Sequence, residues 1–351
     1  MKRFAIGFAA GAFAVYGGLA AAYAALSVVW PERLPAPAIS RLEPLDEKLR
    51  FIREHPSIEP RLLAVGSSIT WRQIDGASFE TLAGGPQRFL NGATGYLKIH
   101  QTRDLLDFYL DHYDDIRSVL IMTGPSDFTD CSDEPAAMLD HDGAATYAFG
   151  RGLSIYYYLR YFSPQRYLRG VMSLSERMTP LTGDLFLDKY GSGPLQVPAS
   201  MRRGLRYGSV ELDPSCVDAL VALSSELTER TRDLIVVFAP VHPEYRRRFP
   251  EVAAWTDRVV RELEERTDGD STRIIRMIDD PAYRPSDFFD AFHLQWPAVR
   301  RLSRDVVAAI LTRAVAADAL IAGKDREATG ECLQAPPTVA SADSCRQLIT
   351  K

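Results

Sequence analysis

Short apolar runs alternate with amphipathic helical patterns along most of this chain, and this alternation restricts the fold more than any other feature. The apolar runs cover residues 62–65, 88–90, 118–123, 234–239 and 273–278, and the helical patterns cover residues 99–113, 215–230, 251–266 and 297–316. Strands that alternate with helices pair in parallel, because each helix carries the chain back to the same edge of the sheet. The sequence therefore predicts an α/β fold, a three-layer sandwich around a central five-stranded parallel sheet.

Polar and glycine-rich segments follow the predicted strands at the point where each strand ends. Residues 66–70 (Gly-Ser-Ser-Ile-Thr) follow the first run, residues 91–95 (Asn-Gly-Ala-Thr-Gly) the second, and residues 124–127 (Gly-Pro-Ser-Asp) the third. His242 follows the fourth run. Ligands of parallel sheets bind beyond the carboxyl ends of the strands, so we expect these segments to meet at one site. At that edge His242 either contacts a substrate or shapes a loop.

Ser68 and the late Asp-x-x-His segment supply the three parts of a serine nucleophile system. Ser68 comes directly after a predicted strand, and Asp290 and His293 come just before the last helical pattern. A serine hydroxyl needs a base, and the ordinary pKa of histidine makes His293 the natural one. Asp290 is three residues earlier, so it can orient the imidazole from the same turn. This combination predicts acyl transfer to or from an alcohol oxygen.

The N-terminus predicts a single membrane-spanning helix. Residues 4–30 contain no charged side chain, and Lys2 and Arg3 precede them. That length is sufficient to cross a bilayer, and the positive charges favour a cytoplasmic N-terminus with the remaining chain on the outer side. Residues 22–24 (Ala-Tyr-Ala) also fit the cleavage site of a removable signal peptide. The apolar run continues to Trp30, which favours a retained anchor in the cytoplasmic membrane.

The domain organisation that follows from these patterns has four parts. Residues 1–30 form the anchor or signal segment, 31–59 a linker and leading helix, 60–315 the catalytic-type domain, and 316–351 an irregular tail. Within the domain, residues 131–207 are too long for an ordinary connection and predict an insertion with its own helices. Its aromatic and basic stretch at 156–169 has three interpretations: it rests on a membrane surface, holds a sugar polymer, or packs its aromatic rings on the core.

Charge and cysteine content narrow the classes of partner. The net charge is −5 with both signs interspersed, so no basic nucleic-acid footprint is present. The chain has four cysteines, an even number that suits an oxidising compartment. One pairing joins Cys332 to Cys345 and Cys131 to Cys216, and the sequence also permits the two other pairings. No spacing of ligand residues predicts a metal site, and no motif predicts a cofactor.

The four motif segments resemble the SGNH (GDSL-type) hydrolase superfamily over roughly residues 60–315. The first family block reads Gly-Asp-Ser, and residues 66–68 match it with Ser67 in place of the aspartate. The third block usually reads Gly-x-Asn-Asp, whereas residues 124–127 carry Ser126 in place of the asparagine. The last block, Asp-x-x-His, matches fully at residues 290–293. The resemblance implies a flavodoxin-like SGNH fold.

The resemblance also implies roles for individual residues. Ser68 takes the nucleophile position, with His293 and Asp290 completing the catalytic set. The backbone N–H groups of Ser68 and Gly95 occupy two oxyanion-hole positions, and Ser126 occupies the third. A serine hydroxyl is shorter than an asparagine amide, so Ser126 either donates directly, acts through a water, or is only a turn residue. No metal or other cofactor is part of this chemistry.

Two functions of different classes agree with these features. The first is a serine-dependent acyl esterase or O-acyltransferase that acts on an acylated carbohydrate or lipid-linked glycan, facing the periplasm or cell exterior. Gly-Ser-Ser also occurs in the D-alanyl-transfer protein of lipoteichoic acid synthesis. Related anchored proteins acetylate exported polysaccharides beside membrane-bound O-acyltransferases, which makes such an enzyme a candidate partner. The alternative is a non-catalytic binding or assembly protein on a degenerate SGNH scaffold, which Ser67 and Ser126 keep open.

Overall fold

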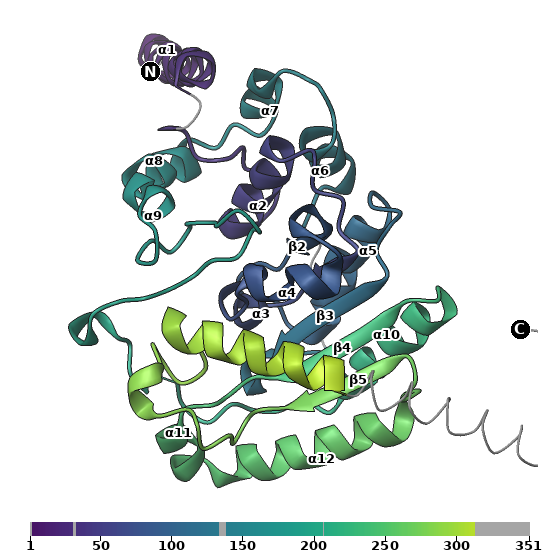
Figure 1. Ribbon diagram of the computed structural model, residues 1–351. Helices are drawn as coiled ribbons and strands as arrows, with labels where there is room; N and C mark the ends of the chain where they lie inside the picture. The colour runs from purple at the N-terminus through teal and green to yellow at the C-terminus, as the bar shows by residue number, and fades with distance from the viewer. Residues whose placement is uncertain (1, 31–32, 133–137, 206, 313–351) are drawn as a thin grey trace, which may run out of the picture. The chain divides into compact units, whose positions relative to one another are not determined.

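A parallel five-stranded sheet lies at the centre of the protein, as the alternating pattern predicts. The computed structural model describes residues 2–30, 33–132, 138–205 and 207–312 (Figure 1). The chain divides into two compact units, Met1–Ser303 and Arg304–Lys351, and the sheet belongs to the first. The strand order is β2-β1-β3-β4-β5, and every neighbouring pair is parallel. The strands are β1 (Leu62–Ala64), β2 (Phe89–Asn91), β3 (Ser118–Thr123), β4 (Asp233–Phe238) and β5 (Thr272–Arg276).

The central strands β1, β3 and β4 are largely apolar because both faces of the sheet are covered there. In β3, every residue after Ser118 is buried, and β4 is buried in the same way after Asp233. Strands covered on both faces lose the alternation of apolar and polar residues that a half-exposed strand shows. All five predicted strands are confirmed, with boundaries that differ by one or two residues at most of their ends.

Helices cover both faces of the sheet. On one face α10 packs on β4 and contacts both α5 and α12, and α12 also contacts β5. On the other face α3 contacts β3 and α4 contacts β2. The first part of the helix 296–312, up to Ser303, also lies on this second face. Ser303 Oγ accepts a hydrogen bond from the backbone N–H of Asp75 at 2.9 Å. The helices named here are α3 (Ser68–Arg72), α4 (Gly76–Ala83), α5 (Ile99–Leu110), α10 (Ser215–Glu229) and α12 (Pro250–Arg266).

The helix α1 (Lys2–Val29) is long and apolar enough to cross a membrane over Ile6–Leu26. The sequence predicts a linker directly after it, but the described part of that segment is packed on the domain. Leu34 is buried, and Tyr158 Oη donates a hydrogen bond to the Pro35 carbonyl at 2.9 Å. The leading helix predicted within 31–59 is α2 (Glu43–Glu54).

The long connection between β3 and β4 contains its own helices, as the predicted insertion requires. The stretch at 156–169 lies mainly in α7 and α8, and Tyr157, Tyr158 and Tyr167 are buried. These three rings therefore pack on the protein interior, whereas Tyr156, Leu159 and Leu168 in the same stretch are exposed. The helices are α6 (His141–Ala148), α7 (Ser154–Arg160), α8 (Pro164–Met172) and α9 (Leu174–Met178). Other short helices in the described residues are η2 (Pro86–Arg88), η3 (Pro125–Asp127), η4 (Ala199–Met201), α11 (Pro243–Arg248) and η5 (Pro285–Asp287).

A disulfide joins Cys131, after η3, to Cys216 in α10. This agrees with the long-range half of the pairing considered from the sequence. The other half, Cys332 with Cys345, lies outside the described residues, as does the predicted tail at 316–351.

Candidate active site

Ser68 lies at the sharp turn between β1 and α3. Gly66 adopts φ 141°, and a Cβ at that position would lie 2.5 Å from Thr70 Oγ1, so the turn requires glycine. Ser67 then caps α3, because its Oγ accepts a hydrogen bond from the backbone N–H of Ile69 at 3.1 Å. The turn leaves Ser68 half-buried, with its side chain on the edge of a pocket.

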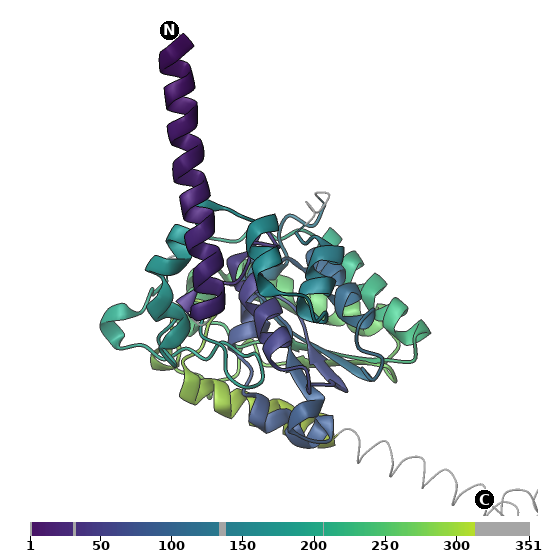
Figure 2. The same ribbon diagram turned by 90° about the horizontal axis from the view of Figure 1, so that it is seen from above.

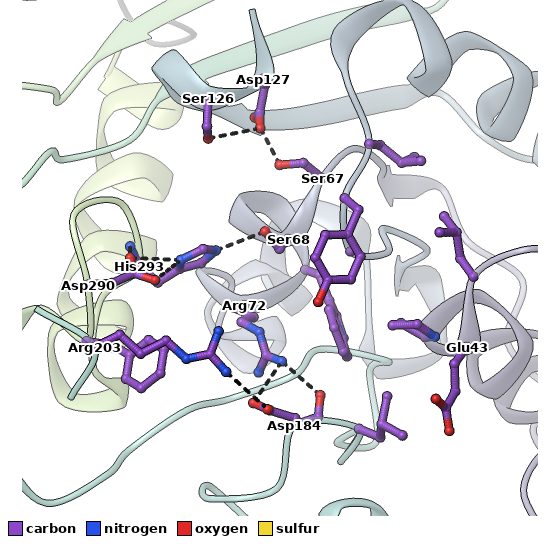
Figure 3. Close-up of a pocket in the computed structure, with 18 of the residues that line it drawn as sticks. Glu43, Ser67, Ser68, Arg72, Ser126, Asp127, Asp184, Arg203, Asp290 and His293 are labelled. Carbon is purple, nitrogen blue, oxygen red and sulfur yellow. Dashed lines mark hydrogen bonds and ion pairs between the residues drawn. The ribbon is translucent and has the colours of Figure 1, made fainter. Parts of the chain in front are cut away.

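Ser68, His293 and Asp290 form a continuous hydrogen-bonded chain (Figure 3). Ser68 Oγ lies 2.9 Å from His293 Nε2, and His293 Nδ1 lies 3.0 Å from each carboxylate oxygen of Asp290. An imidazole with Nδ1–H donating to the carboxylate leaves Nε2 free to accept the serine proton. The sequence-predicted trio therefore comes together with the geometry that proton transfer from a hydroxyl needs.

Asp290 is held as a carboxylate by its surroundings. Burial alone would raise its pKa, but the charge of His293 and the hydrogen bonds from the His293 ring and from two backbone N–H groups outweigh that effect and lower the pKa. These N–H groups belong to Phe292 and His293 and lie 2.9 and 2.8 Å from Oδ1, and Tyr207 Oη donates to Oδ2 at 3.3 Å. The carboxylate is therefore charged at neutral pH and fixes the orientation of the imidazole.

Ser67 and Asp127 connect the first and third motif segments. Ser67 Oγ donates to Asp127 Oδ2 at 2.9 Å, and Thr123 Oγ1 donates to the same oxygen at 2.9 Å. Both Ser67 and Asp127 are buried. Ser67 is thus occupied by capping and by this bond, whereas Ser68 is the serine that reaches His293. Sequence reasoning assigned no role to Asp127 beyond its place in the motif.

The segment 91–95 forms the wall of the pocket beside Ser68. Asn91 is buried, and its side-chain amide donates to the carbonyls of Thr70 and Trp71 at 3.2 and 3.1 Å, which links the segment to α3. The N–H of Thr94 donates to the Gly66 carbonyl at 3.1 Å. These bonds bring Gly95 to the pocket lining together with Ser68, and the role of their two N–H groups as oxyanion donors stays a prediction.

Ser126 also lines the pocket, but its hydroxyl faces Asp127 (Figure 3). Ser126 Oγ lies 3.5 Å from Asp127 Oδ1, a long contact that holds the hydroxyl only weakly. Its carbonyl accepts a hydrogen bond from Lys98 Nζ at 3.1 Å, which fixes the backbone. Its role as a third oxyanion donor stays a prediction.

His242 lies outside the set of residues that line the pocket. The ring is buried, its Nδ1 accepts a hydrogen bond from the Glu244 N–H at 3.1 Å, and it packs against Phe288 at a ring distance of 5.1 Å. Burial lowers the pKa of His242, with the charge of Glu244 opposing that effect. The ring therefore shapes the start of α11, which is the loop-shaping alternative that the sequence left open.

The pocket has a volume of about 610 Å³ and takes one wall from the insertion. Asp184, from the insertion, forms ion pairs with Arg72 at 3.5 Å and with Arg203 at 3.6 Å (Figure 3). Arg72 stacks on Trp71, and burial lowers its pKa. Sequence reasoning missed this group, although Arg72 lies four residues after Ser68 and therefore on the same helix face. This group of two guanidinium groups and one carboxylate carries a net positive charge.

Comparison with known proteins adds no family to this geometry. A scan against protein-family models finds no family that matches the chain, and a search of curated proteins finds no match. Within the described residues, no group of three or more His, Cys, Asp or Glu side chains is placed to hold a metal ion.

Proposed function

We propose that this protein is an SGNH-type serine hydrolase or acyltransferase that moves acyl groups on an envelope or exported glycan. The hydrogen-bonded chain from Ser68 through His293 to Asp290, on the edge of a pocket, carries the proposal. The strand order β2-β1-β3-β4-β5 supports the flavodoxin-like assignment, because it is the order of that fold. The site also lies beyond the carboxyl ends of β1, β2 and β3, where ligands of such sheets bind.

The proposed reaction begins with transfer of the Ser68 hydroxyl proton to His293 Nε2. The Ser68 oxygen attacks the carbonyl carbon of the acyl ester, and the N–H groups of Ser68 and Gly95 hold the oxyanion that forms. The ester bond then breaks, and His293 returns its proton to the departing alcohol. Water or a sugar hydroxyl repeats the same steps on the acyl-enzyme, which regenerates Ser68 and releases an acid or a new ester.

We propose that α1 keeps this domain at the outer face of the cytoplasmic membrane, where it meets acylated carbohydrate or lipid-linked glycan. Tyr23 stacks on Tyr167 at a ring distance of 4.4 Å, so α1 is packed on the domain around the residues where a signal peptidase would cut. The disulfide between Cys131 and Cys216 suits an oxidising compartment. A membrane-bound O-acyltransferase is the partner that would supply acyl groups for transfer.

The decisive experiment tests the nucleophile. The full chain is treated with a serine-reactive fluorophosphonate and with an activated acetyl ester, beside Ser68→Ala and Ser67→Ala variants. We expect Ser68→Ala to lose both labelling and turnover. Ser67→Ala should retain labelling while losing about 2 to 4 kcal/mol of stability, because it removes both the helix cap and the hydrogen bond to Asp127.

Labelling of Ser68→Ala at the parental level would refute the assignment of the nucleophile. If the parent protein neither labels nor turns over the ester, the non-catalytic alternative is favoured instead. The departures at Ser67 and Ser126 from the family pattern are the features that support that alternative.

A further inference from the structure

Exposed apolar side chains outside α1 gather in one stretch of the insertion. In the described part of the chain, ten large apolar residues beyond Trp30 are exposed, and seven of them lie between residues 153 and 178. Their exposed fractions range from 42% to 78%. The solvent-exposed surface of a soluble protein rarely carries so many apolar side chains in one segment, so this cluster marks an interaction surface. The seven residues are Leu153, Tyr156, Leu159, Leu168, Val171, Met172 and Met178.

Six of the seven residues lie in α7 and α8 or at the N-cap of α7, and Met178 is the last residue of α9. Leu168, Val171 and Met172 share one face of α8, because residues three and four apart lie side by side on a helix. Tyr167 and Gly170 on the opposite face are buried. The helix is thus apolar on the face that points away from the domain as well as on the face that packs.

The same helices pack against α1 within the stretch that would cross a membrane. Phe162, between α7 and α8, contacts Tyr16 at a ring distance of 4.7 Å and Tyr23 at 6.1 Å. Leu26 joins the cluster formed by Leu34 and the insertion tyrosines. Figure 2 shows the N-terminal half of α1 extending beyond the rest of the domain, while its other half lies beside the insertion helices.

The length of α1 decides where these contacts lie relative to a bilayer. The part before Tyr16 starts at Lys2 and is about 21 Å long, since an α-helix rises about 1.5 Å per residue. The hydrocarbon core is about 30 Å thick, so this part alone cannot cross it. If Lys2 and Arg3 stay at the inner headgroups, the residues from Tyr16 to about Tyr23 lie within the outer half of the membrane.

We propose that α7 and α8 are immersed in the outer leaflet of the membrane, with the exposed apolar cluster facing the lipid. This inference rests on the proposed anchoring by α1. The lipid is the occupant that the structure favours, because α7, Phe162 and Tyr167 of α8 all contact the stretch of α1 that would cross a membrane. An amphipathic helix at this depth buries its apolar face at the boundary of headgroups and acyl chains.

With α7 and α8 in the outer leaflet, the proposed catalytic pocket lies next to the lipid headgroups. Arg169, beside Leu168 on α8, lines the pocket, and so does Glu176 on α9. The pocket therefore opens at the depth where the headgroup of a lipid-linked glycan, or an acyl carrier at the membrane surface, would present its ester.

Depth-dependent quenching on the full chain in lipid vesicles tests the proposal. Cys332→Ser and Cys345→Ser form the background, so that only an introduced thiol reacts with a bimane label. Leu168→Cys and Met172→Cys probe the cluster, Val15→Cys probes α1, and Glu265→Cys on α12 is the exposed control, because Figure 1 shows α12 at the opposite end of the domain from α7.

We expect labels at Leu168 and Met172 to be quenched by lipids with a nitroxide near the headgroup and protected from aqueous iodide. The label at Val15 should also be quenched by the lipids and protected from iodide. The label at Glu265 should be quenched only by iodide. If the label at Val15 is quenched by lipid while the labels at Leu168 and Met172 are quenched only by iodide, α1 spans the membrane but α7 and α8 are not immersed in it.

Two further outcomes would refute the immersion of α7 and α8 for other reasons. Loss of lipid quenching at Val15 would refute the anchoring itself, independently of the proposed chemistry. Protection of Leu168 and Met172 from both quenchers would show that a protein, such as a second copy or a membrane enzyme, covers the cluster instead of lipid.

Discussion

Replacing Asp127 with asparagine should stabilise the protein at neutral pH but not in acid. Asp127 is buried at 5% exposure, and burial raises its pKa to about 6 although hydrogen bonds from Ser67 and Thr123 oppose that rise. The native state therefore holds the proton more tightly than the unfolded chain, where the ordinary value is 3.8. Stability from this group is fully present below that value and is lost as pH rises through about 6.

The size of the effect follows from the pKa difference. A difference of about two units corresponds to about 3 kcal/mol, which the carboxylate costs the folded state at pH 8. Asparagine removes this cost and keeps the contacts: its amide oxygen can accept from Ser67, Thr123 and the Gly124 N–H, which now bond to Oδ2 of Asp127. Its amide nitrogen would face the Ser126 hydroxyl, which can accept.

Urea unfolding of the full chain in detergent micelles, followed by tryptophan fluorescence, measures this difference. The free energy of unfolding of Asp127→Asn minus that of the parent should grow by up to about 3 kcal/mol between pH 4 and pH 8. Asp270→Asn, in the exposed turn before β5, reports the effect of removing a surface charge. A difference for Asp127→Asn that is flat, or that shrinks as pH rises, would refute the reasoning.

Three further changes test the site and its support. Asp290→Asn should lower ester turnover by roughly 10⁴-fold, because His293 loses the carboxylate that selects its tautomer; unchanged turnover would remove Asp290 from the catalytic set. Ser126→Ala should lower turnover by roughly 10- to 1,000-fold if the hydroxyl holds the oxyanion, and Ser126→Asn should retain activity; three equal rates would make the residue structural. Replacing Cys131 and Cys216 with serine should cost about 4 kcal/mol in urea unfolding, and a reductant should then have no additional effect.

The sheet could be predicted because its strands are buried on both faces. The central strands β1, β3 and β4 are short and largely apolar, and β3 at Ser118–Thr123 is identical in prediction and structure. The hydrogen-bonded trio could be predicted for a related reason: Ser68 lies at the end of a strand, and Asp290 and His293 are close in sequence. Local patterns carry that information.

Contacts between distant segments could not be predicted in the same way. The pairing of Asp184 with Arg72 and Arg203 depends on how the insertion folds over the site, and no periodicity encodes it. The packing of the segment after α1 was missed because its prolines are typical of a linker. In the structure, Leu34 and Pro35 contact residues of α7 and α8, which lie more than 100 residues later in the chain.

Ser67 stands where the resemblance to SGNH proteins leads one to expect aspartate, and its contacts show what the serine does at this position. Ser67 donates its hydroxyl proton to the Asp127 carboxylate and accepts from the Ile69 N–H, so one small side chain satisfies both partners. An ionised aspartate has no proton to donate. It would also set a second buried charge against a carboxylate whose pKa burial already raises. Ser67 thus satisfies two partners without adding a second charge beside Asp127, and the hydroxyl of Ser68 keeps its bond to His293.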